Sequence, residues 1–488
     1  MSTDAAPGTT ARADIAARFE RLPLSRWHVT VRVVIGIVTF FEAFDQLLIA
    51  YTLPELTQEW GLSKGQGTLV ITVGSIGMLV GALFSGRMAD RFGRVKVITA
   101  CIAVTGISSL ALAACGSLEP FMLVRFVQGL AIGGEVPVAA TFIAEITRSM
   151  KRGRFVLLYE LVFPAGLTVG AVVAAWVVPA AGWRTMYVLA ALPGLFCVVV
   201  QRVVPESPRW LADRGRLDEA ARTMTRIEAK VAQSTGRPLP PATPSAAAPL
   251  TEAGPPAAPL APLTKAGPPA PSAAAATPRE LAARGLSGLF SGRYRRRTIV
   301  IWTLWFCGYF VNYGITSWLP TIYKTEYHLS LGEALRYSTV TSVAGLIGCA
   351  IAAFTVDLLG RRKVVAYGLG TAAAMLLVLA ALGGDTAGQI LLWTSLSAAF
   401  FFAANISLYI YTPELYPTRM RASGCSAGGA VNRLGVILGP IAVGGAYAGG
   451  SHPGAAFLLL AVVALAGAVT AGAFAEETAN RPLEEVSP

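Results

Sequence analysis

The sequence predicts an all-α membrane protein whose twelve transmembrane helices form two pseudo-symmetric bundles of six. Three observations support this prediction. First, 54% of the 488 residues are hydrophobic and 14% are charged, whereas soluble domains carry about 25% charged residues. Second, apolar runs of about 20 residues, the length that crosses a bilayer, recur along the chain. Third, two charged motifs occur once in each half of the sequence.

The apolar runs fall into two groups of six, separated by a polar segment. The first group covers residues 29–204 and the second covers 298–475, so their lengths are nearly equal. Equal groups are expected when a six-helix unit has been duplicated. In chain order, the predicted spans are 29–51, 67–88, 95–116, 120–145, 155–180, 184–204, 298–321, 336–357, 363–384, 388–411, 423–448 and 454–475.

Basic residues in the short loops predict the orientation of these spans. The loops after spans 2, 4, 8 and 10 carry thirteen Lys and Arg residues, whereas the opposite loops carry only Lys64, Arg184, Lys324 and Arg336. Positively charged loops resist translocation, so we expect both termini in the cytoplasm and the chain in the cell (inner) membrane. This distribution accounts for the net charge of +12 without any role in binding nucleic acid.

Polar segments flank and separate the two predicted bundles. Residues 1–28 and 476–488 are expected to be cytoplasmic ends, and 1–28 has no apolar segment typical of a cleaved signal. Residues 205–297 form the predicted central cytoplasmic loop, which begins with a short amphipathic helix at 208–232. Within this loop, 232–278 is rich in Pro and Ala, a composition typical of an extended, disordered linker.

Two charged motifs are repeated between the halves at nearly the same spacing. GRMADRFGRVK at 86–96 matches AFTVDLLGRRK at an offset of 267 residues, and AEITRSMKR at 144–152 matches PELYPTRMR at an offset of 269. Charges at these helix ends can pair across the halves in one conformation and separate in another, so we expect a conformational gate. The alternative is simple charge compensation at helix ends. The charged residues are Asp90, Arg94, Glu145, Arg152, Asp357, Arg361, Glu414 and Arg421.

The motifs resemble those of the major facilitator superfamily over nearly all of the chain except 205–297. D-R-x-G-R-x-K after span 2 is similar to the most general motif of that superfamily, and PESPRWL at 205–211 is similar to sugar-porter motifs. FEAFDQLLIAYTLPELTQEWGLS in span 1, RFVQGLAIGGEVPVAATFIAE in span 4 and NYGITSWLP in span 7 resemble metabolite:proton symporters, the aromatic-acid and nicotinate carriers most closely. Aromatic-acid carriers usually have Asp-Gly-x-Asp in span 1, where this chain has Glu42-Ala43-Phe44-Asp45. The resemblance implies a monomeric carrier without cofactors, driven by the proton gradient.

Acidic residues inside the predicted spans are candidates for the proton site. Charges in the hydrocarbon core are unfavourable by about 2.5–3.5 kcal/mol each and normally face a cavity. Glu42 and Asp45 share one face of span 1, Glu135 lies in span 4 and Glu160 lies in the inner part of span 5. Two acids in one cavity favour proton binding, so we expect Asp45 and Glu135, with Glu42 next, to couple protons. The alternative is that each acid only balances a neighbouring arginine.

The sequence also predicts a site for an anionic substrate. Arg433 lies near the middle of span 11, and a buried guanidinium group offers a fork that fits a carboxylate. Organic anion transporters of the superfamily are similar in placing a basic residue in this span. We expect Arg433 to anchor the substrate, with a permanent internal salt bridge as the alternative. Polar and aromatic residues of spans 7 and 10 are expected around it, unless they serve packing alone: Trp305, Tyr309, Asn312, Tyr313, Asn405 and Tyr409.

Other functional classes are less favoured. The chain has no G-x-x-x-x-G-K-[ST] loop for ATP, no metal-ligand spacing among its His and Cys residues, and no catalytic constellation, so no enzyme activity is expected. We expect proton-coupled uptake of a small aromatic or heterocyclic carboxylate by alternating access. A sugar or polyol porter is the main alternative, followed by a drug efflux antiporter and a non-transporting nutrient sensor.

Overall fold

The structure is a computed structural model, and the regular elements that it describes are all helices. The described residues are 14–15, 17–19, 21–23, 25–146, 160–236, 239–240, 289–290, 292–382, 384–416, 418–448 and 453–479. The linker was predicted to begin at 232, but a helix continues to Thr235. Residues 237–238 and 241–278 of this predicted linker lie outside the described residues, as do residues 1–13 and 480–488 at the two ends of the chain.

Eleven described helical runs are long and apolar enough to cross a membrane. The run Val162–Val203 has 42 residues, about twice the length of one crossing. Its backbone leaves the helical conformation at Gly182 (φ 78°, ψ 165°), so this run contains two spans. The described part of the chain therefore has the twelve spans that the sequence predicted.

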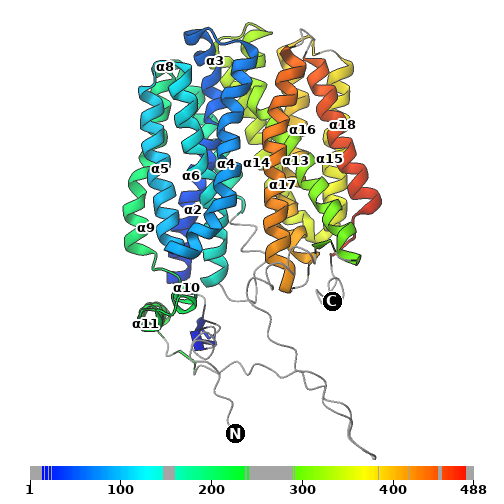
Figure 1. Ribbon diagram of the computed structural model, residues 1–488. Coiled ribbons are helices and arrows are strands. Elements are labelled where there is room, and N and C mark those ends of the chain that lie inside the picture. The colour runs from blue at the N-terminus through cyan, green and yellow to red at the C-terminus, as the bar shows by residue number, and fades with distance from the viewer. Residues whose placement is uncertain are drawn as a thin grey trace, which may run out of the picture.

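The spans form two bundles that lie side by side (Figure 1). The N-terminal half consists of α2 (Arg26–Gln46), α3 (Leu48–Trp60), α4 (Lys64–Phe92), α5 (Arg94–Ala114), α6 (Leu118–Ile146), α8 (Val162–Ala191), η1 (Leu192–Phe196) and α9 (Cys197–Val203). The C-terminal half consists of α13 (Gly292–Thr325), α14 (Leu331–Leu359), α15 (Arg361–Ala381), α16 (Ala387–Glu414), α17 (Thr418–Ala448) and α18 (Gly454–Phe474). Two further helices, α10 (Pro208–Asp213) and α11 (Leu217–Thr235), lie beyond one end of the bundles. We call this end basal and the opposite end apical.

Local structure repeats between the halves at the spacing found in the sequence. α4 begins with a capping box in which Ser63 and Gln66 exchange hydrogen bonds, and α14 begins with the same box at Ser330 and Glu333, 267 residues later. α4 and α14 both have 29 residues, and α5 and α15 both have 21. The two halves are therefore copies of one structural unit, as the charged motifs predicted.

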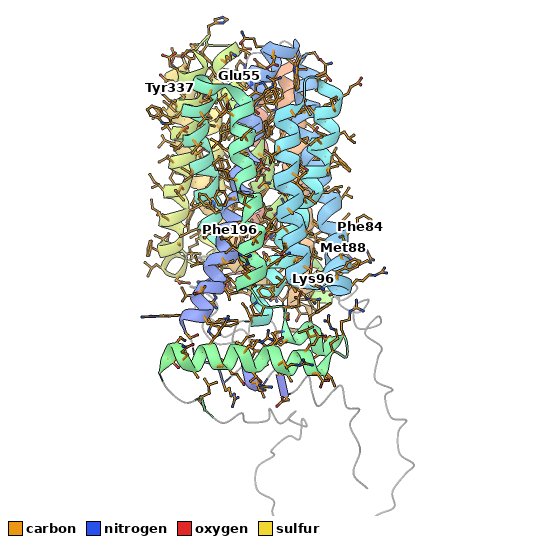
Figure 2. The ribbon with its side chains drawn as sticks, turned by 90° about the vertical axis from the view of Figure 1, so that its left-hand side faces the viewer. Glu55, Phe84, Met88, Lys96, Phe196 and Tyr337 are labelled. Atoms are coloured by element: carbon orange, nitrogen blue, oxygen red, sulfur yellow. The ribbon has the colours of Figure 1, made fainter. Side chains whose placement is uncertain are left out.

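The outer surface is apolar, as expected of a protein surrounded by lipid. Ile107, Trp176, Phe354 and Leu358 are each more than 60% exposed, and large exposed apolar patches are rare on soluble monomers. Figure 2 shows Phe84 and Met88 pointing outward near the basal end. Inside, one hydrophobic core continues across the two halves.

The segment after the sixth span differs from its prediction. The sequence predicted one amphipathic helix at 208–232, but the structure has two, because Gly215 adopts a positive φ of 73° between α10 and α11. α11 lies across the basal end, roughly perpendicular to the spans (Figure 2). Its buried face carries Ala220, Met224, Ile227 and Val231, which follow the periodicity of an amphipathic helix.

The N-terminal segment is held to α11 by ion pairs. Arg18 and Arg21 approach Glu228 to within 2.7 and 2.6 Å. Partial burial would raise the pKa of Glu228, but the hydrogen bonds from Arg18 and Arg21 outweigh this effect and hold it below its usual range. The ion pairs are therefore present at neutral pH and are lost only as the pH falls through this lowered pKa.

Candidate functional site

A cavity between the halves gathers four of the side chains that the sequence predicted for substrate binding. Tyr309 and Asn312 of α13 and Asn405 and Tyr409 of α16 line it, together with Glu160, which precedes α8, and apolar neighbours. The free volume of about 30 Å³ accommodates a few water molecules. An aromatic acid would therefore enter only when the halves or their side chains move apart.

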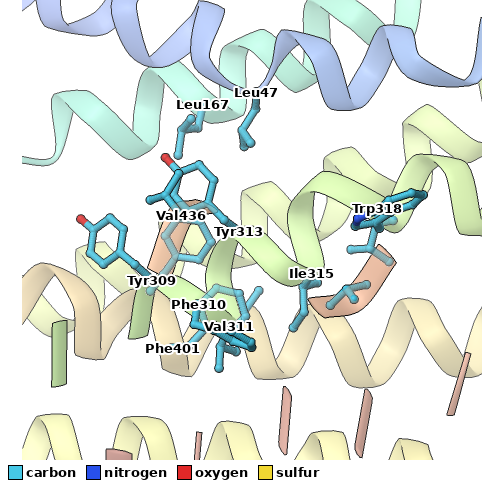
Figure 3. Packing of buried hydrophobic residues seen from close by; sticks show 14 of the residues in the cluster. Leu47, Leu167, Tyr309, Phe310, Val311, Tyr313, Ile315, Trp318, Phe401 and Val436 are labelled. Carbon is cyan, nitrogen blue, oxygen red and sulfur yellow. The ribbon is translucent and has the colours of Figure 1, made fainter. Parts of the chain in front are cut away.

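Aromatic rings form the C-terminal wall of this central cavity. The hydroxyl groups of Tyr309 and Tyr409 are 2.8 Å apart, and the rings of Tyr309 and Tyr313 stack at 6.1 Å. Trp305 packs edge-on against Tyr409 at 4.8 Å and donates a hydrogen bond of 2.9 Å to Thr412. Trp305 thus supports the wall from behind. Figure 3 shows Tyr309 and Tyr313 beneath Leu167 and Leu47 of the N-terminal half.

The amide of Asn405 is fixed at the cavity by a close approach of the backbone. Its Nδ2 donates to the carbonyl of Gly308 at 3.2 Å, while its Oδ1 is buried without a partner. A Cβ atom at position 308 would overlap Asn405 Oδ1, so only glycine permits this arrangement. The unpaired oxygen leaves the cavity one acceptor for a ligand N–H or O–H group.

Arg433 of α17 lies beside the aromatic wall. It is close enough to interact electrostatically with Tyr309, Tyr313 and Tyr409, and also with Glu42 of the N-terminal half. Arg433 is half-buried, and its guanidinium group makes none of the hydrogen bonds or ion pairs found among the described residues. The five N–H donors of the group are thus available to a ligand.

Asp45 belongs to a polar network inside the N-terminal half. Gln128 of α6 donates from Nε2 to Asp45 at 2.6 Å and to Ser109 at 2.8 Å. Arg125 donates to Oε1 of the same glutamine at 2.5 Å and to the carbonyl of Gln46 at 3.4 Å. Asp45 is therefore connected to Arg125 through Gln128, and the network fixes both charged groups.

Glu42 and Glu135 form a separate pair of acids. The sequence grouped Asp45 with Glu135, but the structure places Glu42 of α2 within hydrogen-bonding reach of Glu135 of α6. Both are more than nine-tenths buried, and no N–H or O–H group of the described chain donates to any of their four oxygens. Buried carboxyl groups in such contact are stabilised when they share a proton.

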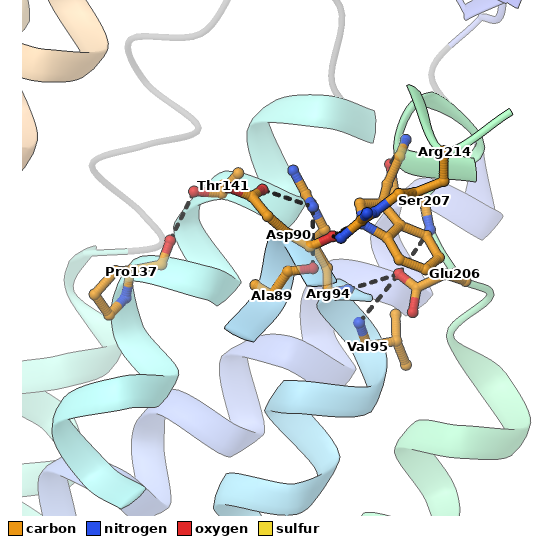
Figure 4. A network of polar contacts seen from close by, with 10 residues as sticks. Ala89, Asp90, Arg94, Val95, Pro137, Thr141, Glu206, Ser207 and Arg214 are labelled. Carbon is orange, nitrogen blue, oxygen red and sulfur yellow. Dashed lines mark hydrogen bonds and ion pairs between the residues drawn. The ribbon is translucent and has the colours of Figure 1, made fainter. Parts of the chain in front are cut away.

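The charged motifs at the basal end form pairs within each half. Arg94 lies 3.0 Å from Asp90, and Arg361 lies 2.8 Å from Asp357 and 3.1 Å from Glu414 (Figure 4 shows the N-terminal set). The side chains of Glu145, Arg152 and Arg421 lie outside the described residues.

Two acidic caps at the basal end were missed by the sequence reasoning. Glu206 accepts hydrogen bonds from the backbone N–H groups of Arg94 and Val95 at 2.9 and 3.2 Å (Figure 4). Glu477 accepts the equivalent bond from Arg361 at 2.9 Å. A carboxylate at a helix N-terminus is stabilised by the helix dipole. The recurrence of Glu–Ser after the sixth span as Glu–Thr after the twelfth was the available signal.

The halves are joined at the apical end. Lys64 of α4 donates to the carbonyl of Tyr447 at 3.2 Å and lies 3.7 Å above its ring. Lys324 of α13 donates to Gln58 of α3 at 2.9 Å. Closer to the central cavity, Thr168 donates to the carbonyl of Ser342 at 3.2 Å. These contacts separate the cavity from the apical surface.

Comparisons with known proteins agree with this architecture. The family model described as Major Facilitator Superfamily matches residues 35–440. The niacin transporter NiaP of Acinetobacter baylyi is 32% identical over 475 residues, which cover 97% of this chain and 99% of that protein. A gallate transporter of Pseudomonas putida is 28% identical and covers 95% of both chains.

A solved structure shows the same fold. The xylose transporter XylE from E. coli, in an inward open conformation, superimposes with a TM-score of 0.66 at 18% identity, covering 94% of this chain and 99% of that one. The match to the family model over residues 35–440, and the match to NiaP over nearly the whole of both chains, show the family as well as the fold. The chain therefore belongs to the major facilitator superfamily and is a multi-pass membrane transporter, not an enzyme.

Proposed function

We propose that this transporter takes up a small aromatic or heterocyclic carboxylate together with protons, by alternating access. The observation that carries the proposal is Arg433, a half-buried guanidinium group with no ionic partner among the described residues, next to an aromatic wall. An arginine in a membrane span that makes no ion pair is unfavourable unless a ligand supplies the opposite charge. A carboxylate would do so through two parallel hydrogen bonds.

The relatives support a carboxylate of this class. The similar proteins from Acinetobacter baylyi and Pseudomonas putida are named as transporters of niacin and gallate. Both compounds combine an aromatic ring with a polar substituent. In the central cavity, Tyr309 and Tyr409 offer a surface for such a ring, and Asn405 Oδ1 offers a hydrogen-bond acceptor.

A neutral sugar is the second candidate, because the fold resembles XylE and the cavity contains Asn312 and Asn405. Neutral sugars do not need a guanidinium group, however, and at 18% identity the likeness concerns the fold alone. A sugar would leave Arg433 without a partner, so a carboxylate accounts better for the site.

Charge and contacts together support an assignment of the conformation. The basal end carries the basic loops and would face the cytoplasm under the positive-inside rule, with both termini there. With this orientation, the closed apical contacts support a state in which the outer gate is shut. The gate residues Asp90, Arg94 and Arg361 then pair within their own halves, and would exchange partners across the halves when the basal end closes.

A counterflow assay tests the proposed function. Purified protein in liposomes preloaded with nicotinate, gallate or xylose is assayed for exchange with external labelled nicotinate. We expect nicotinate or gallate, but not xylose, to drive exchange, and an inward pH gradient to drive accumulation of the carboxylate. In a parallel assay with external labelled xylose, exchange in xylose-loaded liposomes, together with no exchange of nicotinate, would support the sugar porter. Binding without exchange would support a sensor.

Substitution of Gly444 should interfere with closure of the apical gate. A Cβ atom there would overlap Thr68 of α4 and lie 2.8 Å from the Trp318 ring. An overpacked contact is unfavourable by about 1–3 kcal/mol, a penalty that would slow uptake by Gly444→Val roughly 5- to 150-fold. The control is Gly445→Val, because a Cβ atom at position 445 would have no neighbour within 4 Å. Equal uptake rates in the two variants would contradict this role for Gly444.

A further inference from the structure

A second cavity lies inside the N-terminal half and shares no lining residue with the central cavity. Its polar lining consists of Glu42 of α2, Glu135 of α6, and Cys101 and Thr105 of α5. Apolar residues of α2, α5, α6, α8 and η1 complete it, among them Phe196, which Figure 2 labels. Neither the proposed substrate site nor the gate uses this space.

The two acids present unsatisfied oxygens to this cavity. Glu42 is 6% exposed and Glu135 is 3% exposed. None of their carboxyl oxygens has a hydrogen-bond partner among the described residues, although buried polar atoms are normally paired. A proton shared between the two acids would satisfy one oxygen of each, because they lie within hydrogen-bonding reach of each other. The other two oxygens still need small polar partners that the described residues do not provide.

The space has the size and the partners that water needs. Its volume of about 30 Å³ holds a few water molecules, each of which requires two to four polar partners. The carboxyl groups, the Thr105 hydroxyl and the Cys101 thiol supply these partners. Cys101 and Thr105 are only half-buried, so protein atoms do not close the cavity completely on the α5 side.

Glu42 is the link between this cavity and the substrate site. Glu135 of α6 and the Cys101 thiol of α5 lie on its cavity side, and Asp45 is its neighbour on α2. Arg433 of α17 and Tyr313 of α13, both in the C-terminal half, are also within electrostatic range of Glu42, and neither lines this cavity. A proton on Glu42 and an anion at Arg433 are therefore adjacent, without occupying the same space.

We propose that this cavity is a water-filled proton site, through which the Glu42–Glu135 pair gains and loses its proton without using the central substrate cavity. The proposal deepens, and rests on, the proposed proton-coupled transport. When a carboxylate neutralises Arg433, Glu42 loses its nearby cation and binds its proton more tightly. Binding of the anion and binding of the proton then favour each other reciprocally.

Infrared spectroscopy of the purified protein in lipid tests the proton site without any substrate. The C=O band of the protonated pair is identified as the band that disappears in both Glu42→Gln and Glu135→Gln. After transfer to D₂O this band should shift rapidly in the wild-type protein. It should shift several-fold more slowly in Cys101→Leu, which fills the cavity, and in Thr105→Val, which removes a hydroxyl without adding volume.

Matched variants control for general damage to the protein. Cys197→Leu introduces the same side chain at a half-buried position outside the cavity, and Thr105→Ser retains the hydroxyl; both should exchange like the wild type. Absence of such a band, or equal exchange in Cys101→Leu and the wild type, would overturn the proposal. Failure of the wild-type protein to exchange nicotinate or gallate in liposomes would instead overturn the proposed function, and the infrared result would still decide the proton site.

Discussion

Replacement of Arg433 by lysine should raise the KM for carboxylate uptake roughly 10- to 100-fold. Hydrogen bonds to charged groups contribute about 1.5–3 kcal/mol each, and an ammonium group is a point charge that cannot form the two parallel bonds of a guanidinium fork. Loss of one such bond corresponds to this range, since about 1.4 kcal/mol changes affinity tenfold. The measurement is the initial rate of uptake against nicotinate concentration in proteoliposomes.

The effect should appear in KM and leave the maximal rate nearly unchanged, because the lysine variant can still change conformation once it is loaded. Arg336→Lys is the matched control, since Arg336 lies over the Trp176 ring at the membrane-facing surface, away from the central cavity. If Arg433→Lys has wild-type KM at normal expression, Arg433 does not bind the substrate. If Arg433→Lys behaves like the wild type while Arg433→Ala loses both substrate binding and correct folding, Arg433 has a structural role.

The architecture was predictable because the bilayer imposes simple rules on sequence. Span length follows from membrane thickness, and orientation is expected to follow from basic loops. The 267-residue offset of the charged motifs also recurs in the structure, in the capping boxes at Ser63 and Ser330. The break at Gly215 was not predicted, because the amphipathic pattern continues on both sides of one glycine.

The pairing of the buried acids could not be predicted from the sequence. α2 and α6 run in opposite directions, so Asp45 meets Gln128 and Glu42 meets Glu135. The two contacts are three residues apart on α2 (42 and 45) but seven residues apart on α6 (128 and 135). This difference in spacing is set by the angle at which the two helices cross. Periodicity shows that Glu42 and Asp45 share a face, but it does not give the register of that face against its neighbour.

The acidic caps illustrate a second limit. Glu206 and Glu477 lie in polar segments after the spans, where most carboxylates are solvated and contribute little. Their roles became visible only from their contacts with the backbone at Arg94 and Arg361. The glycines before these helices, Gly93 and Gly360, have positive φ values of 111° and 95°, and a Cβ atom at either position would overlap the carboxylate.

Removal of the charge from either acid of the buried pair should abolish uphill accumulation. Glu42→Gln and Glu135→Gln resemble the protonated forms, so the carrier can still move while loaded, but it has no proton to release. Exchange of labelled for unlabelled nicotinate should therefore continue at a rate close to that of the wild type, since exchange needs only the loaded carrier. Net uptake driven by a pH gradient should fall to the equilibrium level.

Asp45→Asn separates this mechanism from its rival. Asp45 accepts a hydrogen bond from Gln128 and is connected through it to Arg125, so loss of its charge leaves a buried arginine uncompensated and should impair exchange and accumulation together. If Asp45→Asn shows exchange without accumulation, while Glu42→Gln and Glu135→Gln still concentrate nicotinate, the coupling site is the Asp45–Gln128 network.

With one proton per monovalent anion, the transported charge is zero and membrane potential has no effect. With two protons, one net charge moves and potential would add about 2.3 kcal/mol per 100 mV, so the response of the wild type to potential gives the number of protons moved with each anion.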